Sequence, residues 1–169
     1  MGQIIYGASL YKSAGNEADI QYDVIGKNSE AFTVGDPLTI TSGALLVAGT
    51  TDPVVGIATK TVTMASNNQT VAKVTPGYIP IKSDDIYLMG CNTDLTGNTT
   101  DGGTYYKLIS AATGAMQVNT AGVQTTTSRV VEIVEVDPQN IGGSGSGSGL
   151  RQALVRFVKT PYTGIPTSS

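Results

Sequence analysis

Carboxylates are the main groups available for acid–base chemistry or metal binding in this chain of 169 residues, which contains no histidine and one cysteine. Calcium, a hard cation, prefers oxygen ligands of this kind. The carboxylates that lie closest together in the sequence, and could bind calcium around a loop, are those of Asp84, Asp85, Asp94 and Asp101. Their spacing fits no calcium-binding loop. Because aspartate side chains also bond to nearby backbone N–H groups, the same residues are typical of turns. We therefore expect turns and no cofactor, with calcium binding kept as the alternative.

The sequence offers no pattern for nucleophilic catalysis or for holding phosphate. Without histidine, Ser–His–Asp and Cys–His systems are unavailable, and Cys91 alone can form neither an intrachain disulfide nor a thiolate metal site. The Gly/Ser run at 142–149 matches neither the dinucleotide-binding nor the P-loop pattern, and its serines miss the nucleophile-elbow spacing. A glycosidase would need paired carboxylates with stacking aromatics, and tryptophan is absent. We expect a protein that is not an enzyme, with a carbohydrate-binding β-domain as an alternative.

Thirteen acidic against ten basic residues give a formal net charge of −3, without a stripe of lysine and arginine. A surface that neutralises nucleic-acid phosphates needs such a stripe, so nucleic acid is not an expected partner. No apolar run approaches the roughly 18 residues that span a bilayer, and nothing at the N-terminus resembles a secretory signal. The glycosylation-like triplets at Asn68 and Asn98 are therefore interpreted as coincidences. We expect no membrane partner and synthesis in a cytoplasm.

Short apolar runs with a period of two, separated by Gly, Asn, Asp and Pro, predict an all-β protein of about ten short strands, folded as a small β-barrel, β-tulip or sandwich. The turn at Ser42-Gly43 predicts a tight hairpin. The last two strands are expected to pair across the Gly/Ser run, whose composition predicts a flexible tip. The predicted strands lie at 38–41, 44–48, 54–64, 70–75, 78–82, 86–90, 105–109, 116–118, 129–136 and 152–159.

Residues 1–35 are predicted to form an N-terminal arm and first strand, and residues 36–169 the β domain with the flexible tip at 142–149. Terminal segments are ordered only where something holds them. The apolar side chains of this arm suit binding to another subunit by strand addition. Alternatively, the arm closes the chain's own sheet. The candidate contact residues in the arm are Ile4, Ile5, Tyr6 and Tyr11.

Tyrosine outnumbers phenylalanine eight to two. This ratio is typical of sheet faces or subunit interfaces, where a tyrosine ring is buried and its hydroxyl remains exposed to solvent. Ordinary cross-strand packing is the competing interpretation. Besides the arm, the candidate contact residues are Tyr105, Tyr106 and Tyr162.

Three neighbouring segments carry a family resemblance. Residues 34–40 read Val-Gly-Asp-Pro-Leu-Thr-Ile, residues 42–45 read Ser-Gly-Ala-Leu, and residues 51–58 read Thr-Asp-Pro-Val-Val-Gly-Ile-Ala. This pattern resembles the core of tailed-phage capsid decoration, or cement, proteins, with a Gly-Asp hairpin, a Gly-centred turn and a strand of the Val-x-Gly-Ile-Ala type. The later region 101–136 fits the family more loosely. The motif concerns folding and contains no catalytic signature.

The resemblance implies a small β-barrel or β-tulip module, often a homotrimer, that sits on the outside of an icosahedral head. Its partner would be the major capsid protein, whose neighbouring subunits it would clamp, and its location would be the virion. A phage tail, fibre or base-plate β-protein is the alternative, and such a protein should form rings or elongated particles on its own.

Overall fold

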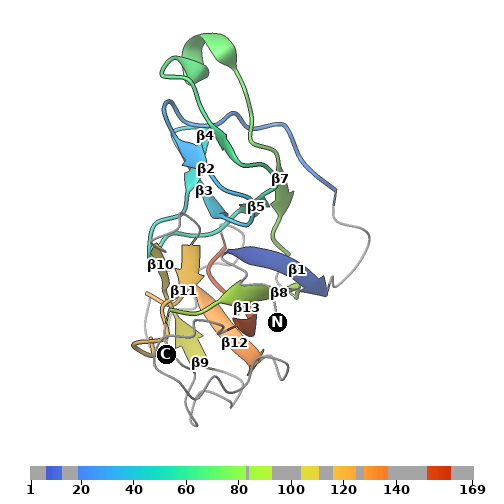
Figure 1. Cartoon of the computed structure of the whole chain (residues 1–169), viewed down its shortest axis with the longest axis vertical. Coiled ribbons are helices and arrows are strands. Elements are labelled where there is room, and N and C mark those ends of the chain that lie inside the picture. The colour runs from blue at the N-terminus through green and yellow to red at the C-terminus, as the bar shows by residue number, and fades with distance from the viewer. Residues whose placement is uncertain are drawn as a thin grey trace.

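The computed structural model describes residues 7–12, 19–82, 84–92, 104–110, 116–124, 128–136 and 152–160. Within these ranges the protein is almost entirely β, with short antiparallel strands and one short helix (Figure 1). The predicted all-β fold class is therefore confirmed. The predicted flexible tip at 142–149 lies outside the described residues.

One sheet has five antiparallel strands and contains both described ends of the chain. Its order is β1 (Ala8–Lys12), β8 (Ile86–Gly90), β13 (Gln152–Phe157), β12 (Val131–Val136) and β9 (Thr104–Tyr106). The predicted pairing of the last two strands is confirmed, because β12 and β13 run antiparallel. Within the predicted arm, β1 pairs with β8 and so adds an edge strand to the chain's own sheet.

A second sheet has four strands in the order β4 (Ala44–Val47), β3 (Pro37–Thr41), β5 (Gly56–Ala58) and β7 (Tyr78–Pro80). The predicted hairpin is β3–β4. Its two turn residues, Ser42 and Gly43, both have positive φ, at 51° and 76°, as a two-residue turn that matches the strand twist requires. Two small sheets complete the fold: β2 (Ala31–Phe32) with β6 (Val62–Thr63), and β10 (Leu108–Ser110) with β11 (Met116–Val118).

Two predicted strands are each divided between different sheets. Residues 54–64 were expected to form one strand, but β5 belongs to the four-stranded sheet and β6 pairs with β2. Residues 105–109 divide at Lys107 into β9 and β10, which also lie in different sheets. Because β propensity describes a fit to neighbouring strands, it does not locate the residue at which a chain changes partners.

The predicted strand at 70–75 is wrong, because a short helix η1 (Asn68–Ala72) occupies its first half and no strand forms in the rest. The residues there are rich in Thr and Val, which favour strands. The side chain of Asn68, however, accepts a hydrogen bond from Val74 N–H at 2.9 Å and so curls the chain back on itself. Side-chain bonds of this kind to nearby backbone offer an alternative to sheet pairing.

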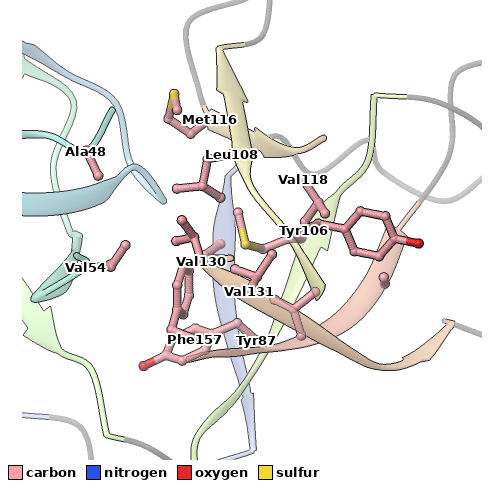
Figure 2. Packing of buried hydrophobic residues seen from close by; sticks show 14 of the residues in the cluster. Ala48, Val54, Tyr87, Tyr106, Leu108, Met116, Val118, Val130, Val131 and Phe157 are labelled. Atoms are coloured by element: carbon pink, nitrogen blue, oxygen red, sulfur yellow. The ribbon is translucent and has the colours of Figure 1, made fainter. Parts of the chain in front are cut away.

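The buried apolar residues form two adjoining clusters, one beneath each large sheet. In the larger cluster the rings of Tyr87 and Phe157 pack edge to face, with centroids 5.3 Å apart. Figure 2 shows that Ala48 and Val54 enter this cluster from the side of the four-stranded sheet. Val47 packs against both clusters, which links them. The smaller cluster comprises Phe32, Leu38, Leu45, Val55, Ala58, Met64 and Tyr78.

Candidate interaction surface

The Gly-Asp segment that carries the family resemblance lies where β1 meets the four-stranded sheet. Gly35 O accepts a hydrogen bond from Ala8 N–H at 2.7 Å, and Gly35 N–H donates to Ala58 O at 2.9 Å. Gly7 and Gly35 both have positive φ, and a Cβ on Gly7 would lie 2.7 Å from Gly35 O. Glycine is required at such a close approach. The segment therefore sets where β1 begins.

Asp36 extends this junction to the small sheet β10–β11. It is 1% exposed, and its carboxylate accepts hydrogen bonds from Thr33 N–H at 2.7 Å and from Met116 N–H at 3.1 Å. Burial raises the pKa of Asp36 above its ordinary value, although these two hydrogen bonds oppose the shift. Because both carboxylate oxygens are engaged by backbone, Asp36 serves to join distant parts of the chain.

Tyr11 is the predicted contact residue that the structure places at an open surface. It is 64% exposed and lies on β1, an edge strand whose only strand partner within the described residues is β8. The register shifts between Leu10 and Lys12, so Tyr11 stands at a β-bulge. Bulges on edge strands redirect a side chain and interrupt the row of free backbone groups. A partner at this edge would therefore meet the Tyr11 ring.

Tyr106 was predicted as a contact residue, and this prediction is wrong. It is 0% exposed and belongs to the larger core cluster. Its neighbour Tyr105 is half-buried, with the Arg129 guanidinium 4.8 Å from the ring centroid. The remaining candidates, Ile4, Ile5, Tyr6 and Tyr162, lie outside the described residues.

The hydroxyl of Tyr106 gives a first testable prediction. It is buried and has no hydrogen-bond partner among the residues that the structure describes. Desolvation, with the nearby Cys91, raises the pKa of this phenol. Since an unsatisfied buried polar group is costly, Tyr106→Phe should leave the free energy of unfolding unchanged or raise it by up to about 1 kcal/mol. Urea unfolding of the purified variant measures this change.

Tyr87→Phe is the matched control, because the Tyr87 hydroxyl donates to Asp85 at 3.3 Å. This variant should lose about 1 kcal/mol. A loss of similar size in Tyr106→Phe would mean that its hydroxyl does have a partner in solution.

Two members of the predicted acidic group, Asp84 and Asp85, lie within the described residues. Asp84 is exposed, whereas Asp85 is buried and accepts the Tyr87 hydrogen bond. Burial, together with the Asp85 carboxylate, raises the pKa of Tyr87. Asp94 and Asp101 lie outside the described residues. Among the residues that the structure does describe, no three His, Cys, Asp or Glu side chains are grouped so as to hold a metal ion.

A second exposed surface was missed by the sequence analysis. The segment 19–28 lies beside 67–78: Gln21 and Tyr78 form a β-bridge, and Gly26 N–H donates to Val74 O at 2.9 Å. These two segments carry half of the exposed large apolar side chains of the described chain. Two of these exposed residues, Val71 and Val74, lie in the segment 70–75 that was predicted as a strand. The exposed large apolar residues are Tyr11, Ile20, Tyr22, Val34, Ile40, Val71, Val74 and Val123.

The comparisons with known proteins add no family to this description. The chain matches no protein-family model, and the searches of curated proteins and of solved structures found no match. Within the described ranges, no helix has the length and apolar character needed to cross a membrane.

Proposed function

We propose that this chain is a structural protein of a virus particle, which attaches as a homotrimer to the outer surface of a tailed-phage capsid and clamps neighbouring subunits of the major capsid protein. The observation that carries the proposal is the exposed Tyr11 ring at the bulge of edge strand β1. The resemblance of residues 34–58 to decoration proteins supplies the identity of the partner.

The junction at Gly35 and Asp36 supports this role. It ties the start of β1 to the four-stranded sheet and to β11 through three hydrogen bonds, at Ala8, Ala58 and Met116. The edge that bears Tyr11 is therefore held in place before any partner binds. A pre-ordered contact loses less conformational freedom on binding, which strengthens the interaction.

Stabilisation of the head would follow from mass action. A protein that binds only the assembled shell shifts the equilibrium away from disassembly, by an amount that grows with its concentration relative to Kd. Because the same contact recurs around the shell, each one needs to be only moderately strong. This mechanism requires no acid–base chemistry, and it uses exposed aromatic side chains of the kind that dominate binding energy at protein interfaces.

The test is co-sedimentation of the purified protein with undecorated heads, for the wild type and for Tyr11→Asp. We expect the wild type to sediment with the heads and the variant to bind at least tenfold more weakly, because aspartate replaces a ring that would be buried in the contact. A point substitution is preferred to deletion of the arm, since Ala8 is buried and Leu10 packs against the core.

Val123→Asp serves as the matched control, because Val123 is 56% exposed on a different segment. Its binding should equal that of the wild type. If the wild type fails to bind heads and instead forms rings or tubes by electron microscopy, the protein belongs to a phage tail and the proposal is refuted. If Tyr11→Asp binds heads as well as the wild type does, β1 does not contact the capsid.

A further inference from the structure

The buried carboxylate of Asp36 joins two parts of the chain that lie 80 positions apart. Its Oδ2 accepts a hydrogen bond from Thr33 N–H at 2.7 Å, and its Oδ1 accepts one from Met116 N–H at 3.1 Å. An ionised carboxylate offers two acceptor oxygens, whereas a protonated carboxyl group keeps one strong acceptor and gains a hydroxyl. The uptake of one proton would therefore leave one of these two N–H groups without a good acceptor.

The bond to Thr33 belongs to a tight turn that other hydrogen bonds hold in place. Asp36 N–H donates to Thr33 O at 3.0 Å, so the backbone and the side chain of Asp36 both engage Thr33. Ala58 N–H donates to Asp36 O at 2.9 Å and fixes Asp36 to β5. Since these bonds position the carboxyl group without help from β11, the bond to Thr33 should survive protonation.

The bond to Met116 is the longer of the two, and it connects separate sheets. Met116 begins β11, and its side chain packs in the larger core cluster with Leu108 of β10 (Figure 2). The small sheet β10–β11 has a further attachment, because Leu108 N–H donates to Thr50 O at 3.0 Å. Loss of the Met116 bond would thus loosen the connection to Asp36 and leave the small sheet attached to the molecule.

The charged groups near Asp36 are identified from the elements around it. Burial, and to a smaller extent the charge of Glu30, raises the pKa of Asp36. The strands next to Asp36, which are β3, β5 and β11, carry no titratable side chain. In β1, which reaches the junction through Ala8, the titratable residues Tyr11 and Lys12 lie at the opposite end of the strand. A change of pH therefore acts on this junction through Asp36, with Glu30 as its charged neighbour.

The direction of the effect follows from proton linkage. Burial raises the pKa of Asp36, and the hydrogen bonds from Thr33 and Met116 lower it. If the Met116 bond breaks while the carboxyl group stays buried, one of the lowering contributions disappears and the pKa rises further. The state that binds the proton more tightly is favoured as the pH falls. Acid therefore favours release of Met116, but not unfolding, because the pKa in the folded state lies above its ordinary value.

We propose that Asp36 is a proton-operated latch between the small sheet β10–β11 and the turn at Thr33. In the ionised state the carboxylate holds both Thr33 N–H and Met116 N–H. In the protonated state it keeps Thr33 and releases Met116. The attachment of the small sheet thus depends on pH while the protein as a whole remains folded. This inference goes beyond the proposed function and involves no partner.

The test follows the protection of backbone N–H groups from hydrogen exchange, measured by NMR on the full chain between about pH 7 and about pH 4. We expect the protection factor of Met116 N–H to fall by about tenfold or more as Asp36 takes up its proton. The N–H groups of Thr33 and Ala58 should keep their protection. Circular dichroism over the same range should show that the protein stays folded.

Two variants make the test specific to Asp36. Asp36→Asn has one acceptor oxygen at every pH, so its Met116 N–H should be weakly protected and should no longer respond to pH. Glu30→Gln keeps an acceptor for Val47 N–H but removes the negative charge near Asp36. Release of Met116 in this variant should therefore require a lower pH than in the wild type. Glu30→Gln keeps the test decisive even if Asp36→Asn does not fold.

Three outcomes would overturn the latch. Met116 N–H could keep its protection over the whole pH range, or Thr33 and Ala58 could lose theirs together with Met116, which would indicate general loosening of the fold. A pH-dependent release of Met116 in Asp36→Asn would mean that another group takes up the proton. Because no capsid heads enter this experiment, its failure leaves the proposed function untouched, and failure of head binding leaves the latch untouched.

Discussion

Asp36→Asn should lower the free energy of unfolding by about 2–6 kcal/mol, since two buried groups, one backbone N–H and the new side-chain NH₂, are left without partners at about 1–3 kcal/mol each. In the wild type, one carboxylate accepts hydrogen bonds from both Thr33 N–H and Met116 N–H. The amide of asparagine has one acceptor oxygen, so its NH₂ group would face an N–H donor. Because Met116 begins β11, the loss should loosen the junction between the sheets. Urea unfolding measures the change.

The matched control is Asp52→Asn, whose carboxylate also accepts a backbone hydrogen bond, from Gly49 N–H at 2.8 Å, but in an exposed turn. Water can replace that bond, so the expected loss is below about 1 kcal/mol. Equal losses of unfolding free energy in the two variants would mean that the burial of Asp36 does not increase the cost of losing its hydrogen bonds.

The effect of Asp36→Asn should also depend on pH. Burial, and to a smaller extent the charge of Glu30, raises the pKa of Asp36 in the folded protein above 3.8. The folded state then binds a proton more readily than the unfolded state, so this contribution to stability is complete below the ordinary pKa and is lost as the pH rises through the folded pKa. The stability difference between wild type and variant should therefore be larger at acidic pH than at neutral pH. A difference that grows with pH would show that the two hydrogen bonds outweigh burial.

Gly56→Ala is expected to cost about 2–3 kcal/mol, at the upper end of the usual range for overpacking. A Cβ at this position would lie 2.4 Å from Tyr78 Cδ2 and 2.7 Å from Ile79 O, which belongs to the backbone of β7. The ring could rotate, but the carbonyl is held in the sheet by the pairing of β5 with β7. Relief therefore requires these two strands to separate. Thermal or urea unfolding reports the loss.

Gly122→Ala is the control for this substitution. Among the described residues, its Cβ would contact the end of the Gln124 side chain alone, at 3.8 Å, so stability should change by less than about 0.5 kcal/mol. If Gly56→Ala changed stability as little as Gly122→Ala, the strands β5 and β7 would not approach each other as closely as the structure shows. Asp36 and Gly56 both lie in the segments that resemble decoration proteins, and in this structure both act in folding.

The candidate surface could be predicted from the sequence only in part. The apolar arm singled out Tyr11, which does lie exposed at a sheet edge. The same reasoning selected Tyr106, which is buried, because alternation in a strand separates two faces without saying which one is covered. Helix η1 escaped prediction, because the Asn68 side chain bonds both to Val74, nearby in the chain, and to Gly26, far away in it.

The sequence by itself determined the local features of this protein. Strands β8 and β11 have the predicted bounds, the Ser42-Gly43 turn forms the β3–β4 hairpin, and β12 pairs with β13. Each of these depends on alternation or turn chemistry, which act between residues close in the chain or directly across a hairpin. Such interactions are encoded in short stretches of sequence.

Only the tertiary structure decided which partners distant segments find. It divided residues 54–64 between two sheets, formed η1 where β-branched residues favour a strand, buried Tyr106, and brought Asp36 to Met116 across 80 positions of the chain. The physical reason is that burial and long-range hydrogen bonds outweigh local propensity, which spans only about 1 kcal/mol per residue in strands.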